Sequence, residues 1–134
     1  MVAYSFNKQF ALPIITGRKQ QTIRKPRPRH ARPGETLQLY QGMRTKHCAL
    51  IGTARCFQTM AIKIQLEANK VITTSPNDGS LDTWASSKAL DQFAQSDGFR
   101  DWQDMKAFWH KTHPGLAVFE GVLIRWEQFT EAQP

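Results

Sequence analysis

Several kinds of residue or segment are scarce in this sequence, and each shortage argues against a class of protein. The two cysteines, Cys48 and Cys56, lack the paired CxxC spacing of a zinc or thioredoxin site. We expect both thiols to be buried and reduced, which favours the cytosol. No apolar run approaches the roughly 18 residues of a membrane span. The first residues also lack the basic stretch and apolar stretch of a secretory signal. We therefore expect a cytoplasmic protein with no membrane partner.

Acidic residues are missing from the first quarter of the chain. Residues 1–34 contain eight Lys or Arg and no Asp or Glu, whereas the remaining hundred residues carry ten basic and eleven acidic side chains. The whole net charge of +7 therefore comes from one segment. Such asymmetry is typical of a surface that binds phosphates or another anion. The alternative is a solvated basic loop that serves solubility.

The length and composition indicate one globular domain. The chain has 134 residues, of which 40% are hydrophobic and 22% charged, which is ordinary for a folded domain. A chain of this size buries enough surface for one core. We expect the domain to span 1–130 and a short frayed tail to follow at 131–134.

The hydrophobic pattern predicts strands on both sides of a helical pair. From the N-terminus we expect a helix at 7–16, an extended run at 21–25, a stiff Arg/Pro loop at 26–34, strands at 35–40, 47–59 and 61–74, helices at 86–96 and 101–110, and a strand at 116–129. The pattern has too few βαβ alternations for a parallel sheet. It favours the α+β class, as a small antiparallel β-barrel with helices packed on its side.

The densest polar cluster is the octapeptide from Gly17 to Arg24. Strand alternation after Gly17 places Thr22 and Arg24 on one face and Ile23 on the other. A hydroxyl and a guanidinium directed into a fold are costly unless partners satisfy them. These partners belong either to a structural network or to a site that binds a ligand.

Two segments resemble ASCH domains, which are relatives of the PUA fold. The first segment carries the more specific motif and the second supports it; they are Phe10-x-x-x-Ile14-x-x-Gly17-Arg18-Lys19-x-x-Thr22-Ile23-Arg24 with Pro33-Gly34-Glu35-x-Leu37, and Asp97-Gly98-Phe99 with Met105, Phe108 and Trp109. The resemblance extends from about Phe6 to Trp126. It implies a small β-barrel flanked by helices, with a basic cleft between them.

The resemblance implies two activities. Some small bacterial members of the family remove acyl groups from N4-acylcytidines, including N4-acetylcytidine, with a Lys, a Thr and an acidic residue as the catalytic set. Carried onto this chain, that set is Lys19, Thr22 and Asp97, although those enzymes have Glu at the last position and are shorter. Other members bind RNA, and divalent-metal-dependent ribonuclease activity is known in the family.

The residue chemistry is compatible with an amidase. A threonine hydroxyl needs a base to take its proton, and Lys19 can serve only if its pKa falls well below the usual value of about 10.4. Burial and neighbouring cations both lower the pKa of a lysine. In the alternative arrangement, Lys19 stays charged and stabilises the oxyanion while Asp97 activates water. We expect three further residues to bind the substrate, namely Arg24, Arg18 and Tyr40.

The rival interpretation is an RNA-binding protein or ribonuclease that uses the same basic segment. Its phosphate-binding residues are Lys25, Arg27, Arg29 and Arg32. A divalent metal such as Mg²⁺ enters only under this alternative. We expect no other cofactor and no metal site, because the His110 and His113 pair lacks further ligands. The expected partner is a modified cytidine nucleoside or RNA, and a monomer is favoured.

Overall fold

The computed structural model describes residues 1–133. Its elements are β1 (Val2–Phe6), the 3-10 helix η1 (Lys8–Phe10), α1 (Ala11–Ile15), β2 (Gln21–Arg24), β3 (Thr36–Gln41), β4 (Ala49–Gln65), β5 (Lys70–Thr74), β6 (Leu81–Trp84), α2 (Ser87–Ser96), α3 (Trp102–Thr112) and β7 (Val118–Glu131). All seven strands belong to one sheet. The α+β class expected from the sequence is confirmed.

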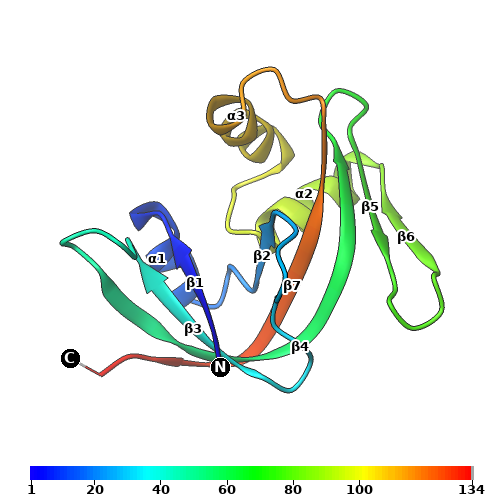
Figure 1. Ribbon diagram of the computed structural model, residues 1–134. Coiled ribbons are helices and arrows are strands. Elements are labelled where there is room, and N and C mark those ends of the chain that lie inside the picture. The colour runs from blue at the N-terminus through cyan, green and yellow to red at the C-terminus, as the bar shows by residue number, and fades with distance from the viewer. Residues whose placement is uncertain (134) are drawn as a thin grey trace.

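Strands β4 and β7 form the centre of the sheet and pair antiparallel over most of their length. Because β4 has 17 residues, two partners share its other edge: β3 pairs with its first half and β5 with its last five residues. Strand β6 pairs with β5, β1 pairs in parallel with β3, and β2 pairs with β7. The bend of β4 separates these two halves of the sheet (Figure 1).

The sheet is open between β1 and β2. Within residues 1–133 no ladder joins these two strands, although each is paired along its other edge. The expected closed barrel is therefore not confirmed. The antiparallel expectation holds for every pair except β1 and β3. This opening determines where polar side chains can enter the fold.

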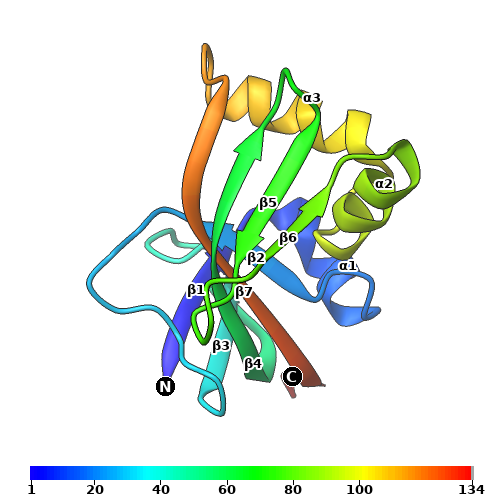
Figure 2. The same ribbon diagram turned by 90° about the vertical axis from the view of Figure 1, so that its right-hand side faces the viewer.

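The helices and the Arg/Pro loop occupy different parts of the molecule. Figure 2 shows α1 and α2 on the right, α3 across the top and the loop between β2 and β3 projecting to the left. Both long helices begin where the sequence predicts, because a side chain caps each N-terminus. Ser86 Oγ accepts a hydrogen bond from Ala89 N, and Asp101 Oδ1 accepts one from Asp104 N.

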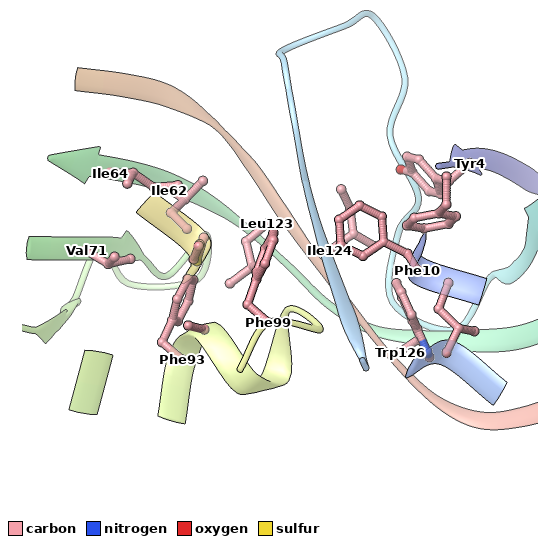
Figure 3. Packing of buried hydrophobic residues seen from close by; sticks show 14 of the residues in the cluster. Tyr4, Phe10, Ile62, Ile64, Val71, Phe93, Phe99, Leu123, Ile124 and Trp126 are labelled. Carbon is pink, nitrogen blue, oxygen red and sulfur yellow. The ribbon is translucent and has the colours of Figure 1, made fainter. Parts of the chain in front are cut away.

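The hydrophobic core occupies both faces of β7, whose neighbouring side chains point to opposite faces. Leu123 lies with Phe93 and Phe99 on the helical side, whereas Ile124 and Trp126 lie with the aromatic residues of the N-terminal segment (Figure 3). Trp126 is only 2% exposed. The core therefore has two groups of side chains, one on each side of this strand.

Several expected elements have different boundaries in the structure. The helix expected at 7–16 is divided into η1 and the five-residue α1, which ends just before Gly17 at φ 80°. The strands expected at 47–59 and 61–74 are β4 and β5, because β4 continues without a break and the turn comes later, at Asn69 with φ 51°. Strands β1 and β6 were not expected.

Other expectations concern the cysteines, the chain end and membrane helices. Cys56 is buried as expected, but Cys48 is exposed because it precedes β4. The tail expected at 131–134 reaches beyond the described residues at position 134, while Ala132 N still donates to Ile51 O. No helix among residues 1–133 combines the length and the apolar composition needed to cross a membrane.

Two aromatic residues on the central strands test this packing. We expect Trp126→Ala to lower the free energy of unfolding by about 3–5 kcal/mol, because it leaves a large cavity in the core. Phe57 is 45% exposed, at a bulge in β4. We therefore expect Phe57→Ala to lower the free energy of unfolding by only about 0.5 kcal/mol. Urea unfolding of both variants measures the difference. Equal losses of stability would contradict the assignment of the core.

Candidate active site

A cavity of about 220 Å³ lies at the opening between β1 and β2. We call it the β1–β2 cavity. Three parts of the chain line it: the end of β1 and η1, the segment through β2, and the residues around α2 and α3. The lining residues are Ser5, Phe6, Asn7, Phe10, Lys19, Thr22, Ile23, Arg24, Asp97, Phe99, Phe108 and Trp109. The octapeptide and the second ASCH-like segment therefore meet here.

Lys19 and Asp97 form a buried pair in the wall of this cavity. Lys19 Nζ donates a hydrogen bond of 2.7 Å to the backbone carbonyl of Asp97 and lies 3.6 Å from its Oδ1. The two residues are 3% and 5% exposed. Two backbone hydrogen bonds hold the lysine segment, from Lys19 N to Pro13 O and from Gln20 N to Ser96 O. The pair thus connects the N-terminal segment to the end of α2.

Gly98 makes room for the lysine stem. It has φ 95°, a conformation that side chains rarely adopt. A Cβ at this position would lie 3.0–3.3 Å from three carbons of the Lys19 side chain. The glycine thus permits both the turn after Asp97 and the close approach of Lys19.

Burial shifts the pKa of both members of the pair towards the neutral form. Desolvation lowers the pKa of Lys19 below its ordinary 10.5, against the opposing attraction of Asp97, and nearby Arg24 lowers it further. Desolvation likewise raises the pKa of Asp97, against the attraction of Lys19 and the hydrogen bond from Gln21. Both shifts favour a state in which Lys19 is an amine and Asp97 a carboxylic acid.

Gln21 belongs to a hydrogen-bond chain that the sequence did not reveal. Its Nε2 donates to Asp97 Oδ1 at 3.3 Å, and its Oε1 accepts from Arg125 Nε at 3.3 Å. Arg125 also donates to Gln58 Oε1 at 3.1 Å. Because an arginine only donates, it fixes which end of the Gln21 amide faces Asp97. Gln21 therefore positions the carboxyl group, and the pairing of β2 with β7 was the missing signal.

Arg24 connects β1 and β2, which do not pair with each other in the sheet. Its Nη2 donates to the Ser5 carbonyl at 2.6 Å, and its Nε donates to Thr22 Oγ1 at 2.9 Å. The guanidinium also lies over the rings of Tyr4 and Phe6, at 5.3 and 4.8 Å. Thr22 is 4% exposed, and its oxygen accepts from Arg24 while its proton can be donated elsewhere.

Aromatic rings form much of the remaining wall. Phe10 lies 5.5 Å from Phe99 and 5.4 Å from Phe108, edge to face in both cases. Figure 3 shows Phe99 beside Leu123 in one part of the core and Phe10 beside Ile124 in the other. Lys19 Nζ lies 4.9 Å from the centre of the Phe10 ring and 5.6 Å from that of Phe6. The aromatic residues of α3 therefore serve both the core and the cavity.

The other sequence-predicted residues lie outside the β1–β2 cavity. Arg18 is exposed, and Tyr40 lies on β3, opposite Ser5. Neither lines the cavity. The four predicted phosphate-binding residues are exposed in the loop between β2 and β3, which we call the basic loop (residues 25–35): Lys25, Arg27, Arg29 and Arg32.

The basic loop is ordered by contacts with Tyr4 and Glu35. His30 stacks on Tyr4 and its Nδ1 lies 2.9 Å from the phenol oxygen, while the Arg27 guanidinium lies 4.7 Å from the same ring. Glu35 pairs with Arg29 and accepts from the backbone of Arg32. The loop thus holds Arg27 and His30 against Tyr4 of β1, the strand that borders the cavity.

Comparison with known proteins shows which solved structures this fold is similar to. No protein-family model matches the chain, and no curated protein matches it in sequence. The crystal structure of ASCH from Zymomonas mobilis, however, matches 96% of this chain and 68% of its own with a TM-score of 0.54. The chain has an ASCH-like fold. A Tyr-to-Phe mutant of the Zymomonas protein matches with a TM-score of 0.56, over 98% of this chain and 72% of its own.

The similarity concerns the ASCH-like fold alone. A Ser-to-Ala mutant of the same Zymomonas protein matches with a TM-score of 0.54, over 96% of this chain and 68% of its own. Each of the three structures is 12% identical in sequence to this chain. The resemblance seen in the two sequence segments is thus confirmed by the fold. The chemistry must be argued from the site itself.

Titration of Lys19 tests the electrostatics of the pair. We expect the pKa of Lys19 to lie below 10.5 and to fall further in Asp97→Asn, because the carboxylate that favours the ammonium is gone. NMR titration of the lysine ε-carbons measures both values. Exposed Lys111 serves as the control that the substitution leaves unchanged. A Lys19 pKa that does not respond to Asp97→Asn would contradict the pairing.

Proposed function

We propose that this protein is an amidohydrolase that removes the acyl group from N4-acylcytidine-type substrates. The observation that carries the proposal is the convergence of Lys19, Thr22, Arg24 and Asp97 on one small, partly aromatic cavity. A nucleophile, a base whose pKa is lowered by desolvation, an acid and a fixed cation are the groups that amide hydrolysis uses.

The size and lining of the cavity support a substrate group of the size of one base. Its volume of about 220 Å³ is below the roughly 300 Å³ at which pockets for drug-sized ligands begin. Rings of Phe6, Phe10 and Phe99 offer faces and edges to a planar heterocycle. An acylated cytosine enters such a cavity as one ring with its exocyclic amide, while the sugar remains outside.

In the proposed first step, Thr22 Oγ1 attacks the acyl carbonyl carbon. The hydroxyl proton passes to neutral Lys19 Nζ, which becomes an ammonium. The carbonyl π-bond pair moves to oxygen and gives an oxyanion. Arg24 remains charged and already donates to Thr22 Oγ1. It therefore stabilises negative charge on the attacking oxygen and beside it.

Collapse of the tetrahedral intermediate breaks the bond between the acyl carbon and N4. The departing nitrogen takes the proton from the Lys19 ammonium, directly or through Asp97, which Lys19 then reprotonates; cytidine leaves and Lys19 is again a neutral amine. Water then attacks the ester on Thr22 with Lys19 as the base, which releases the carboxylic acid and restores the hydroxyl. The balance is one amide and one water converted to one amine and one acid, through side chains alone.

A direct attack by water is the alternative arrangement. Lys19 then remains an ammonium that stabilises the oxyanion, and ionised Asp97 activates the water. The directions of the two pKa shifts favour the Thr22 route, since both move the pair away from the charged state that this alternative needs. The two routes differ in whether an acyl group is ever bonded to Thr22.

Chromatography of reactions with N4-acetylcytidine tests the activity. We expect wild type to release cytidine, Thr22→Ala to lose at least about 1000-fold in kcat, and Thr22→Ser to retain measurable turnover. The rate is expected to rise with pH through the lowered pKa of Lys19, because the base must be neutral. Thr53→Ala, on a strand outside the cavity, is the matched control.

Mass spectrometry of quenched wild type separates the two routes. An acetyl group on the peptide that contains Thr22 supports the covalent route, whereas turnover without it supports attack by water. The absence of cytidine from wild type would overturn the proposed activity.

A second candidate function, RNA binding, is favoured by the basic loop. Lys25 and Arg32 are exposed and form no ion pair with another residue in 1–133. A free neutral nucleoside makes no use of such charges, whereas a phosphate backbone does. On the wall of the β1–β2 cavity, Asp97 is the one carboxylate among the described residues, so the structure favours binding over a multi-carboxylate metal nuclease.

The salt dependence of RNA binding tests this function. We expect the double variant Lys25→Gln/Arg32→Gln to bind single-stranded RNA more weakly. Its slope of log affinity against log salt should be shallower by about 0.7 for each phosphate that the variant no longer neutralises. The same change at Lys88 and Lys111, on α2 and α3, is the control. An RNA affinity that is independent of salt would contradict the role of the loop.

A further inference from the structure

A second pocket adjoins the β1–β2 cavity. Its volume is about 580 Å³, and the loop after β3 forms its far side. We call it the β1–loop pocket. Three residues, Ser5, Phe6 and Asn7, line both the cavity and this pocket, so the two adjoin at the end of β1. The remaining lining residues are Lys8, Gln41, Gly42, Met43, Thr45 and His47.

The loop that closes this pocket is fastened to the same strand that borders the cavity. Gly42 N donates to Phe6 O at 3.1 Å, and Met43 N donates to Ser5 Oγ at 3.0 Å. Within the loop, Thr45 Oγ1 donates to Gly42 O and accepts from His47 N. These hydrogen bonds fix the loop, and with it the far wall of the pocket, relative to β1 and the cavity.

The surroundings of the β1–loop pocket are rich in Lys and Arg. Lys8 lines it together with His47, and Arg44 and Lys46 belong to its loop; all four residues are exposed. Glu35 is the single acidic residue among positions 1–48, and its carboxylate is already engaged by the basic loop. None of Lys8, Arg44 and Lys46 forms an ion pair with another residue in 1–133. No Asp or Glu is among the described residues that line this pocket, so an anion that enters it contacts no carboxylate in its wall.

We propose that the β1–loop pocket binds a phosphate carried on the ribose of the substrate. With the base in the β1–β2 cavity, the sugar lies over Ser5–Asn7 and its phosphate reaches Lys8 and His47. This inference rests on the proposed function and narrows it: the preferred substrate is an N4-acylated cytidine nucleotide, free or within RNA, rather than the nucleoside. The pocket is large enough for a ribose phosphate, since ligand pockets begin at roughly 300 Å³.

Binding measurements test the pocket independently of catalysis. Calorimetry compares cytidine with cytidine 5′- and 3′-monophosphates at low salt, and we expect one monophosphate to bind about 10- to 100-fold more tightly, as charge-assisted hydrogen bonds to phosphate predict. Lys8→Gln/His47→Gln should remove this preference and leave the affinity for cytidine unchanged. Lys111→Gln is the control. Equal affinities for cytidine and both monophosphates would overturn the proposal.

Kinetics separates the two sources of the phosphate and the two proposals. We compare N4-acetylcytidine, its monophosphates and a short RNA that contains one N4-acetylcytidine. A higher kcat/KM for a monophosphate than for the nucleoside, abolished in Lys8→Gln/His47→Gln, supports the pocket. A further increase with the RNA, abolished in Lys25→Gln/Arg32→Gln, identifies a polynucleotide substrate.

The failures of the two proposals differ in these assays. Equal kcat/KM values for nucleoside, monophosphates and RNA would overturn the phosphate pocket and leave the amidohydrolase intact. No turnover of any substrate, together with tight and Lys8-dependent binding of a monophosphate, would overturn the amidohydrolase and support the pocket.

Discussion

An ammonium group and a carboxyl group removed from water impose a constraint that organises this part of the molecule. Transfer of each ion from water costs several kcal/mol, and attraction within the pair offsets this only when hydrogen bonds also satisfy both groups. The contacts of Lys19 and Asp97 meet that requirement through the Asp97 carbonyl, the Gln21 amide and the aromatic rings around Nζ. Gly98 leaves the space in which the lysine stem passes. The same burial that makes the pair costly also shifts the pKa of each group towards its neutral form.

Much of the candidate site could be predicted from local sequence, because three of its residues are close together in the chain. Lys19, Thr22 and Arg24 occur within six positions, and strand alternation alone places the last two on one face. Asp97 came from the resemblance to ASCH domains, since nothing local connects it with Lys19, 78 positions away. Gln21 and Arg125 were missed because their contact depends on the pairing of β2 with β7, which no local pattern reports.

The fold was predictable to a similar extent, and its prediction failed for related reasons. The two long helices followed from their capping residues and apolar stripes. The predicted break between two strands near Met60 was wrong. The sequence there has no turn residue, so the chain continues as one strand, β4, and turns only at Asn69. The opening of the sheet between β1 and β2 follows from which edges remain unpaired, a property of the whole topology rather than of any segment.

Strand β7 follows every other element of the described residues, and this order has a consequence during synthesis. In the described residues, β2 obtains its ladder from β7, and the Gln21 contact that positions Asp97 comes from Arg125. Domains generally complete their folding as units, and pairings between distant segments form slowly. While β7 remains inside the ribosome, β2 therefore lacks its paired strand and the Gln21 amide lacks the partner that orients it toward Asp97. The candidate site is completed only when β7 has emerged and paired with β2.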